Sequence, residues 1–375
     1  MVRIVCGMSG GVDSSLSAAL LKEQGHEVVG VTMKLWPCAE SDGGFTREDA
    51  CCSPTETIDA RAVAMTSGVA HYVLDLEAEF RSQVVQDFVT GYATGLTPNP
   101  CVRCNESIKF GELWQYARRL GAERVATGHY ARVACPWDDR WLLRTAVDKA
   151  KDQTYFLFSL TQEQLAHADF PVGGLTKDEV RQAARARGLV TADKRESQDI
   201  CFIGDEGMVA FLRREIPQAF VPGPIELEDG TVLGEHQGLC GYTLGQRKGL
   251  GVAWSEPLFV VRLERERNAV VLGSRAALLV TEQTLHSCTW HAGALPAQGL
   301  SCLVRVRHRG KLIPATILPA GGDRAVVRFD EPQQRASPGQ ACVAYDPTQE
   351  WCWGGGWIAV AGDTPVTRDL VQSTT

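Results

Sequence analysis

The sequence predicts an α/β domain at the N-terminus, built on a parallel sheet, followed by a small mixed central domain and a C-terminal β-barrel. Apolar strands alternate with amphipathic helices in the first third of the chain. Helix and strand patterns mix after about residue 200, and only short strands follow residue 281. The length of 375 residues is more than one ordinary core accommodates. We therefore expect domains at residues 1–200, 201–280 and 281–365.

The predicted N-terminal domain begins with a strand and continues as strand–helix units. Its strands are short apolar runs, expected at 3–7, 27–33, 72–76 and 124–127. Its helices have apolar residues at helical spacing, and they are expected at 14–24, from a capping box at 53–56 to about residue 68, at 77–92 and at 108–120. Because strands joined through helices pair in parallel, we expect one parallel sheet with helices on both faces.

The rest of the chain loses this alternation. A second capping box at 176–179 begins a helix that Gly188 ends. A turn at 228–231 joins two short strands. Further short strands are expected at 303–307, 315–318, 325–329, 341–345 and 357–360, with turn residues between them. This pattern predicts a small barrel, or a sandwich of similar size.

The composition is that of a globular protein, with 44% hydrophobic and 22% charged residues. No apolar run is long enough to cross a membrane and the N-terminus lacks the layout of a secretion signal, so we expect a cytoplasmic protein without membrane contact. Most of the 13 cysteines should then be reduced, and Cys6, Cys240 and Cys342 should be small buried side chains. The net charge of −7 leaves nucleic-acid binding open, since such binding depends on local basic patches.

A loop with the sequence S-G-G-V-D-S-S, residues 9–15, lies between the first strand and the first helix. Its glycines allow a tight turn, and the N–H groups at the helix start can bind an anion. Asp13 would repel a phosphate, so its presence implies a cation or a structural bond. A Walker loop requires a lysine that this segment lacks. The loop instead resembles the S-G-G-x-D-S motif of the ATP pyrophosphatases, which cleave ATP between the α and β phosphates.

Three residues follow neighbouring strands at the edge of the sheet where this loop lies. Met33 ends the second strand, and Gly128 and His129 follow the fourth. Because ligands of such sheets bind at the carboxyl ends of the strands, we expect these residues to line an adenosine pocket. Taken alone, His129 is more typical of a buried or loop histidine.

Three cysteines stand outside the apolar pattern. Cys101 and Cys104 form a C-x-x-C motif in 98–105, a segment whose prolines predict a loop. Such a pair is typical of a redox couple, half a zinc site or a single nucleophile, and no second C-x-x-C follows to complete a zinc site. Arg103 should lower the pKa of a neighbouring thiol. Cys201 is either a plain buried cysteine or a partner of this pair, and two cysteines that meet can pass on sulfur through a persulfide.

At these motifs the chain resembles the bacterial tRNA-specific 2-thiouridylases of the ATP pyrophosphatase superfamily. The matching segments are GMSGGVDSS at 7–15, TPNPCVRCN at 97–105, TGHYAR at 127–132, KDQTYFL at 151–157, ESQDICFIG at 196–204 and GYTLGQRKGLG at 241–251. The resemblance implies a HUP-like nucleotide domain, a small central domain and a C-terminal barrel. It also implies an ATP-dependent tRNA-uridine 2-sulfurtransferase, which adenylates the C2 oxygen of the wobble uridine and replaces it with sulfur.

The resemblance further implies roles for individual residues. ATP with Mg²⁺ would be held by Gly7, Met8, Ser9, Gly10, Gly11, Val12, Asp13, Ser14, Met33 and Gly128, with Asp13 also catalytic. Cys104 would be the nucleophile and Cys201 the persulfide carrier, and the two would join as a disulfide during turnover. The tRNA would be contacted by Asn99, Pro100, Cys101, His129, Lys151, Asp152, Gln153, Arg307, His308 and Gln340, with 307–308 on a barrel strand. A sulfur-relay protein or a cysteine desulfurase would supply the sulfur.

Cys101 departs from part of this family, in which an aspartate assigned an acid–base role occupies the position. A cysteine cannot take over that role unchanged. A second hypothesis is that Cys101, Cys104 and Cys201 ligate a four-iron four-sulfur cluster with one open iron site. The sequence is also compatible with an ATP pyrophosphatase ligase without sulfur chemistry and with a non-catalytic RNA-binding protein.

Two basic clusters are candidates for holding the phosphate backbone of the tRNA. The first comprises Arg181, Arg185, Arg187, Lys194 and Arg195, and the second comprises Arg305, Arg307, Arg309 and Lys311. For each residue singly, a solvated surface charge is the simpler interpretation.

Overall fold

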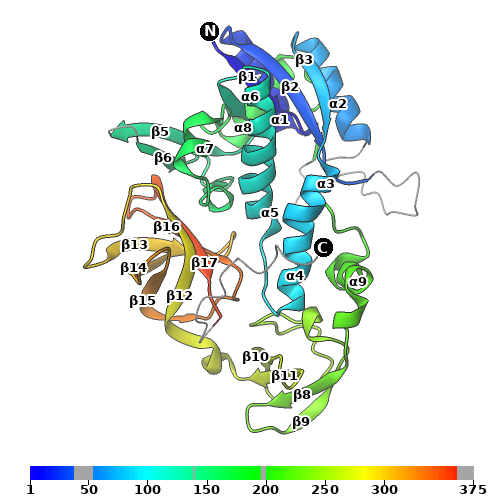
Figure 1. Cartoon of the computed structure of the whole chain (residues 1–375), viewed down its shortest axis with the longest axis vertical. Helices are drawn as coiled ribbons and strands as arrows, with labels where there is room; N and C mark the ends of the chain where they lie inside the picture. The colour runs from blue at the N-terminus through cyan, green and yellow to red at the C-terminus, as the bar shows by residue number, and fades with distance from the viewer. Residues whose placement is uncertain (38–53, 138–139, 196–199, 361–375) are drawn as a thin grey trace.

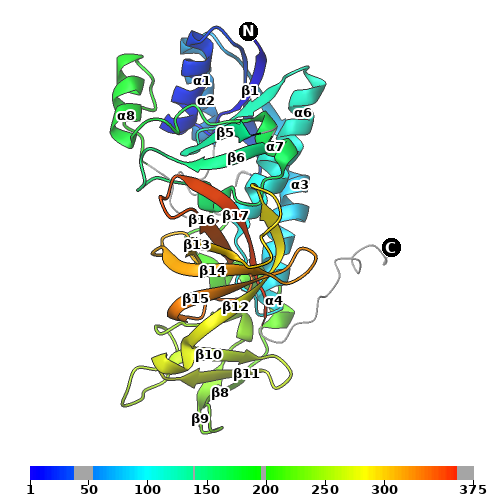
Figure 2. The same cartoon turned by 90° about the vertical axis from the view of Figure 1, so that its left-hand side faces the viewer.

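The computed structural model describes residues 1–37, 54–137, 140–195 and 200–360. Three regions follow one another along its long axis (Figures 1 and 2). The N-terminal sheet and its helices lie at the top of Figure 1, the β-barrel lies at lower left, and the central domain lies at the bottom. This arrangement confirms the predicted sequence of an α/β domain, a mixed domain and a barrel. No helix in the described ranges is long and apolar enough to cross a membrane.

The N-terminal sheet has five strands, all paired in parallel. Their order is β3-β2-β1-β4-β7, with β1 at Arg3–Gly7, β2 at Glu27–Lys34, β3 at Ala70–Asp75, β4 at Arg124–Ala126 and β7 at Ala168–Asp169. Ile4 and Cys6 belong to one buried cluster and Val5 to another. Since neighbouring side chains of a strand point to opposite faces, the sheet is covered on both sides, as predicted. The two-residue strand β7 was not predicted.

Helices of the first domain cover this sheet. They are α1 (Val12–Glu23), α2 (Pro54–Thr66), α6 (Leu113–Arg119), α7 (Gln162–His167) and α8 (Lys177–Ala186). Thr176 and Glu179 form the predicted capping box of α8. Ser53 of the other predicted box lies outside the described residues.

Two helical columns extend from the sheet and pack along each other (Figure 1). One comprises α3 (Glu77–Phe80), the π-helical turns of Arg81–Val85 and α4 (Gln86–Ala93), which together match the helix predicted at 77–92. The other comprises α5 (Pro100–Arg103), the π-helical segment Cys104–Glu112 and α6. The prediction of a loop at 98–105 was therefore wrong beyond Asn99. Proline is tolerated at the first helical position because no earlier carbonyl needs its missing N–H, and Asn99 caps the helix.

The central domain contains one helix, α9 (Gly207–Glu215), within the described ranges, and a sheet in the order β10-β11-β8-β9. These strands are β8 (Gly223–Leu227), β9 (Val232–His236), β10 (Phe259–Glu264) and β11 (Ala269–Gly273). The turn predicted at 228–231 joins β8 to β9. Single 3-10 turns lie at Thr154–Phe156, Pro217–Ala219, Leu239–Gly241 and Arg275–Leu278.

The C-terminal strands form a barrel rather than a sandwich. They are β12 (Leu279–Trp290), β13 (Leu300–Arg305), β14 (Ile313–Pro319), β15 (Ala325–Gln334), β16 (Ala341–Tyr345) and β17 (Trp351–Ile358). Their order is β12-β15-β14-β13-β16-β17, and pairing of β12 with β17 closes the ring. A hairpin from the N-terminal part, β5 (Ala131–Trp137) and β6 (Arg140–Thr145), extends this sheet by pairing with β17. Neither β12 nor this hairpin was predicted.

Candidate functional site

The loop between β1 and α1 has a fixed internal geometry. Gly10 has a φ of 74°, and a side chain there would come within 2.8 Å of the Cα atom of Glu56. The Ser9 N–H donates to the Ser14 hydroxyl at 3.1 Å, and that hydroxyl donates to the Gly11 carbonyl at 3.1 Å. Among the described residues, no side chain caps the N-terminus of α1. Its first N–H groups are therefore not taken up by a side-chain cap, which is compatible with the anion site that the motif predicts.

The predicted nucleotide residues outside the loop lie at the same edge of the sheet. Met33 is the last residue but one of β2, and the Thr32 hydroxyl beside it donates to the Met8 carbonyl at 2.8 Å. Gly128 follows β4, and a Cβ atom there would lie 2.5 Å from the Ser14 nitrogen. Glycine at 128 thus allows the chain to pass directly against the first turn of α1.

Asp13 is held by two residues to which the sequence analysis gave no role. The Tyr130 hydroxyl donates to Asp13 Oδ1 at 2.7 Å. Lys177 Nζ donates to both carboxylate oxygens, at 2.8 and 2.9 Å. The expected partner of Asp13 was a cation or a structural bond, and the Lys177 ammonium provides a positive charge through such a bond. Tyr130 lies inside the TGHYAR motif and Lys177 inside the capping box at 176–179, but neither motif by itself indicates a contact with Asp13.

Cys104 and Cys201 contact one hydrophobic cluster. Cys104, only 9% exposed, is the first residue of the π-helical segment, and half-buried Cys201 precedes the buried Phe202. Both pack with side chains of the α3–α4 column, where the ring of Phe88 lies 5.2 Å from that of Phe202. Met33 packs against the same cluster. Cys104, Cys201 and Met33, which lies near the end of β2, therefore share one hydrophobic cluster. Residues 196–199 of the motif before Cys201 lie outside the described residues.

The three cysteines considered as cluster ligands are not arranged as a metal site. Cys101 is exposed on α5, whereas Cys104 is buried. Within the described parts of the chain, no three His, Cys, Asp or Glu side chains lie where they could hold a metal ion together. In this conformation the residues do not fit an iron–sulfur cluster.

Arg103 faces the barrel. Its guanidinium carbon lies 4.6 Å from the ring centre of Trp357 on β17, and its nitrogens pair with Glu106 at 3.2 Å and Asp87 at 3.5 Å. Two carboxylates therefore compensate its positive charge. Its side chain also links the cysteine helix to the barrel.

Comparisons with known proteins match this arrangement. Family models for the tRNA methyl transferase HUP domain, the tRNA methyl transferase PRC-barrel domain and the aminomethyltransferase β-barrel domain match residues 2–205, 209–274 and 280–358. The chain is 47% identical over 360 residues to the tRNA-specific 2-thiouridylase MnmA of Geobacter metallireducens, covering 96% of this chain and 97% of the relative. It is 46% identical over 359 residues to that of Chloroflexus aurantiacus, covering 96% and 99%. This chain belongs to the tRNA-specific 2-thiouridylase family.

The barrel of this 2-thiouridylase-family chain holds the segment that precedes the cysteine helix. The Thr97 N–H donates to the Pro338 carbonyl at 2.8 Å, and the Gln340 side-chain amide donates to the Thr97 carbonyl at 2.7 Å. Gly339, between them, has a φ of 85° and lies close to Leu96 and Thr97. Gln340 was predicted to contact tRNA, and here its side chain holds the segment before α5.

The other residues predicted to contact tRNA differ in exposure. Cys101 and Arg307 are exposed, Asn99, Lys151, Gln153, His308 and Gln340 are partly buried, and Pro100, His129 and Asp152 are buried. Arg307 and His308 follow the end of β13 rather than lying on it, because the strand ends at Arg305. The His308 ring lies 4.2 Å from that of Phe156, and Gln153 accepts a hydrogen bond from the Tyr130 N–H at 2.8 Å.

Burial shifts the pKa of two of these residues. The pKa of His129 lies well below its usual 6.5, chiefly because burial disfavours the charged ring, with Lys109 adding to the effect. Burial likewise raises the pKa of Asp152, although its carboxylate accepts hydrogen bonds from Thr154 and the Ala146 N–H. Whether either residue meets RNA stays a prediction.

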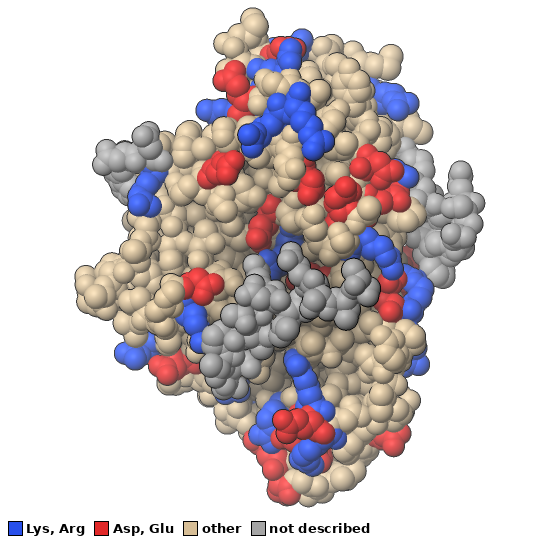
Figure 3. Space-filling view, viewed as in Figure 1, with Lys and Arg blue, Asp and Glu red and all other residues tan. Residues whose placement is uncertain are grey.

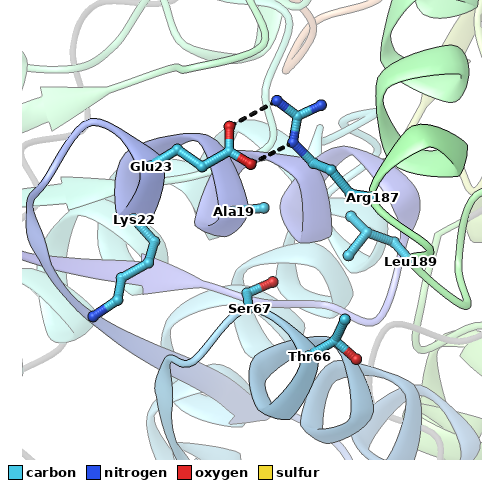
Figure 4. A pocket seen from close by; sticks show the side chains of 7 residues that line it. All are labelled: Ala19, Lys22, Glu23, Thr66, Ser67, Arg187 and Leu189. Carbon is cyan, nitrogen blue, oxygen red and sulfur yellow. Dashed lines mark hydrogen bonds and ion pairs between the residues drawn. The ribbon is translucent and has the colours of Figure 1, made fainter.

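The first basic cluster is engaged within the protein. Arg187 forms two bonds of 2.7 Å with Glu23, which close one side of a pocket lined also by Ala19, Lys22, Thr66, Ser67 and Leu189 (Figure 4). Arg185 pairs with Asp193, and Arg181 donates to the carbonyls of Ala192 and Lys194. These contacts join α8 to α1 and to the chain that leads to Cys201. The simpler interpretation, structural surface charges, therefore holds for these arginines.

Proposed function

We propose that this protein is a tRNA-uridine 2-sulfurtransferase. It converts the wobble uridine of a tRNA to 2-thiouridine, with ATP giving AMP and pyrophosphate. The observation that supports this most is the convergence of Cys104 and Cys201 on a cluster that also contacts Met33 at the phosphate-loop edge. This shared cluster supports a sulfur-transfer site close to the activating site.

The first step activates the base. The C2 oxygen of uridine attacks the α phosphorus of ATP, the bond to the β phosphate breaks, and pyrophosphate leaves. The N–H groups at the start of α1 stabilise the negative charge that develops on the phosphates. Asp13 is the carboxylate suited to bind a magnesium ion, which would supply further charge neutralisation. Because an anticodon base is stacked, it must leave the stack before it can react.

The second step transfers sulfur between named atoms. The terminal sulfur of a Cys201 persulfide attacks C2, and AMP leaves with the former C2 oxygen. The Cys104 thiolate then attacks Cys201 Sγ, which releases 2-thiouridine and leaves a Cys104–Cys201 disulfide. A thiol reductant reopens that disulfide, and a sulfur-relay protein or cysteine desulfurase reloads Cys201. We place this cycle in the cytoplasm.

The test uses the three cysteines that share the hydrophobic cluster. Cys104→Ala and Cys201→Ala each remove a reacting thiol, whereas Cys240→Ala removes an equally small buried thiol that has no role in the mechanism. In a gene-deletion strain, either reacting-site variant should lower 2-thiouridine in tRNA by at least about 100-fold relative to the wild type. Cys240→Ala should restore it. Mass spectrometry of tRNA nucleosides measures all three, and full 2-thiouridine with Cys104→Ala would overturn the mechanism.

Rival functions predict different results. A ligase of the same superfamily, or a methyltransferase as the descriptions of the domain models suggest, would form its product without Cys104 and Cys201. A non-catalytic RNA-binding protein would release no AMP when tRNA and Mg²⁺ are added. An iron–sulfur enzyme would lose activity with its iron, so full thiolation at near-zero iron and labile sulfide, after anaerobic purification, removes that hypothesis.

A further inference from the structure

The Asp13–Lys177 pair places a buried cation beside the phosphate loop. We propose that Lys177 is a nucleotide-binding residue: it neutralises Asp13 in the absence of ATP and binds the β and γ phosphates when ATP is present. The proposal rests on the proposed function, in which the loop at 9–15 binds ATP.

The contacts of Lys177 define its charge partner. Its side chain bonds both oxygens of Asp13, and its ammonium lies 5.6 Å from the centre of the Tyr130 ring. The residue is 8% exposed, and a lysine this buried is rarely found without a charge partner. Tyr130 donates to the same carboxylate, so three residues from separate segments meet at one point.

Local helix stability does not explain a lysine at this position. Lys177 is the first residue of α8, where the helix dipole disfavours a cation. Thr176 and Glu179 cap the helix, and Asp148 accepts a hydrogen bond from the Lys177 N–H at 3.0 Å. A side chain in a first helical turn points back beyond the helix start. Here that direction leads to the N-terminus of α1, the predicted anion site.

A triphosphate at this loop needs a nearby positive charge, because Asp13 is negatively charged. Asp13 lies in the first turn of α1, among the N–H groups that would bind phosphate. A triphosphate brought there is repelled by the carboxylate unless a positive charge stands between them. If Asp13 held a magnesium ion, its carboxylate would no longer need Lys177, and the long flexible stem of the lysine would let its ammonium turn to a phosphate oxygen.

Comparing nucleotides tests the proposal. AMP lacks the β and γ phosphates, so Lys177→Met should weaken binding of ATP and of pyrophosphate by about 10- to 100-fold, the effect of one lost hydrogen bond to a charged group. AMP affinity should be unchanged. Isothermal titration with each ligand, in Mg²⁺ and in EDTA, measures the differences. Lys22→Met is the matched control, because Lys22 lies in the last turn of the same helix α1, by the pocket of Figure 4.

Repeating the Lys177→Met substitution in an Asp13→Asn variant distinguishes phosphate binding by Lys177 from a purely structural ion pair with Asp13. The Asp13→Asn variant lacks the carboxylate charge. If Lys177 acted only by neutralising Asp13, replacing Lys177 in this variant would not weaken nucleotide binding any further. We expect Lys177→Met to weaken ATP and pyrophosphate binding by about 10-fold even in that background. No further loss there would overturn the proposal. This double variant also leaves no buried unpaired charge, so it keeps the test valid where Lys177→Met alone fails to fold.

Different binding results would contradict the proposed function and the role of Lys177. Wild-type protein that binds neither ATP nor pyrophosphate contradicts the proposed function itself. Wild-type protein that binds both, together with Lys177→Met that binds them equally well, contradicts only the role of Lys177.

Discussion

Burial sets the charge state of His129, a residue of the TGHYAR motif. Its ring centre lies 6.3 and 6.0 Å from those of Phe110 and Phe170, and its Nδ1 lies 2.7 Å from the Thr127 hydroxyl. Because the pKa is held well below 6.5, the ring stays neutral at physiological pH. Any contact it makes with RNA therefore involves a neutral imidazole and not a cation.

The shifted pKa of His129 predicts a pH dependence of stability. The unfolded chain binds a proton at this histidine below about pH 6.5 and the folded chain does not, so the free energy of unfolding falls as pH drops below that value. The contribution is at most about 1.4 kcal/mol per pH unit. His129→Gln should remove it. Urea denaturation of both proteins between pH 6.5 and 5.5 measures the difference, which cancels all other titrating groups, and parallel curves would contradict the expectation.

At the scale of elements, the segment before the cysteine helix depends on a turn of the barrel. Asn99 and Pro100 begin α5, but the residues just before them have no regular structure and are held by Pro338 and Gln340. Arg103 adds a second link through Trp357. A movement of the barrel on binding RNA would therefore reach Cys101 and Cys104 directly.

Gln340→Ala should loosen this segment in the absence of tRNA. It removes the hydrogen bond to the Thr97 carbonyl, a loss of about 1 kcal/mol, so amides at 96–103 should exchange about fivefold faster. Hydrogen–deuterium exchange with mass spectrometry measures the rates. Gln333→Ala is the control, since its amide donates within its own strand, to Glu331. Equal exchange in both variants would show that Gln340 does not restrain the segment.

At the scale of the whole molecule, an acidic protein must bind an acidic polymer. The net charge is −7, and basic and acidic side chains are interspersed on the face shown in Figure 3. The arginines of α8 bond to carboxylates or carbonyls of the protein itself. Exposed Arg307, beside the end of β13, is a better candidate for a phosphate contact than these.

Salt dependence distinguishes the two kinds of arginine. Arg307→Ala should weaken tRNA binding and reduce the slope of log K against log salt by about 1, since one phosphate contact is lost. Arg185→Ala should leave the slope unchanged, because Arg185 is paired with Asp193. Binding titrations from low to physiological salt measure both slopes. Equal slopes for Arg307→Ala and the wild type would exclude this contact.

The sequence by itself determined the class of each part. Hydrophobic periodicity predicted the parallel sheet, the helix at 77–92 and the barrel strand at Ala341–Tyr345, because side-chain spacing along one segment decides which face is buried. Motifs predicted that residues 9–15 form a phosphate loop and marked Cys101, Cys104 and Cys201 as candidate site residues. The domain limits 1–200, 201–280 and 281–365, and the roles of individual site residues, stay predictions.

Only the tertiary structure decided which segments that are far apart in the chain contact each other. The hairpin β5–β6 pairs with β17, Cys201 meets the cluster of Cys104, and Lys177 meets Asp13. No local pattern encodes such contacts, because they depend on which surfaces remain to be buried once each element has formed. For the same reason, the local sequence at 9–15 was enough to predict the phosphate loop, whereas the ion pair of its Asp13 with the distant Lys177 could not be predicted.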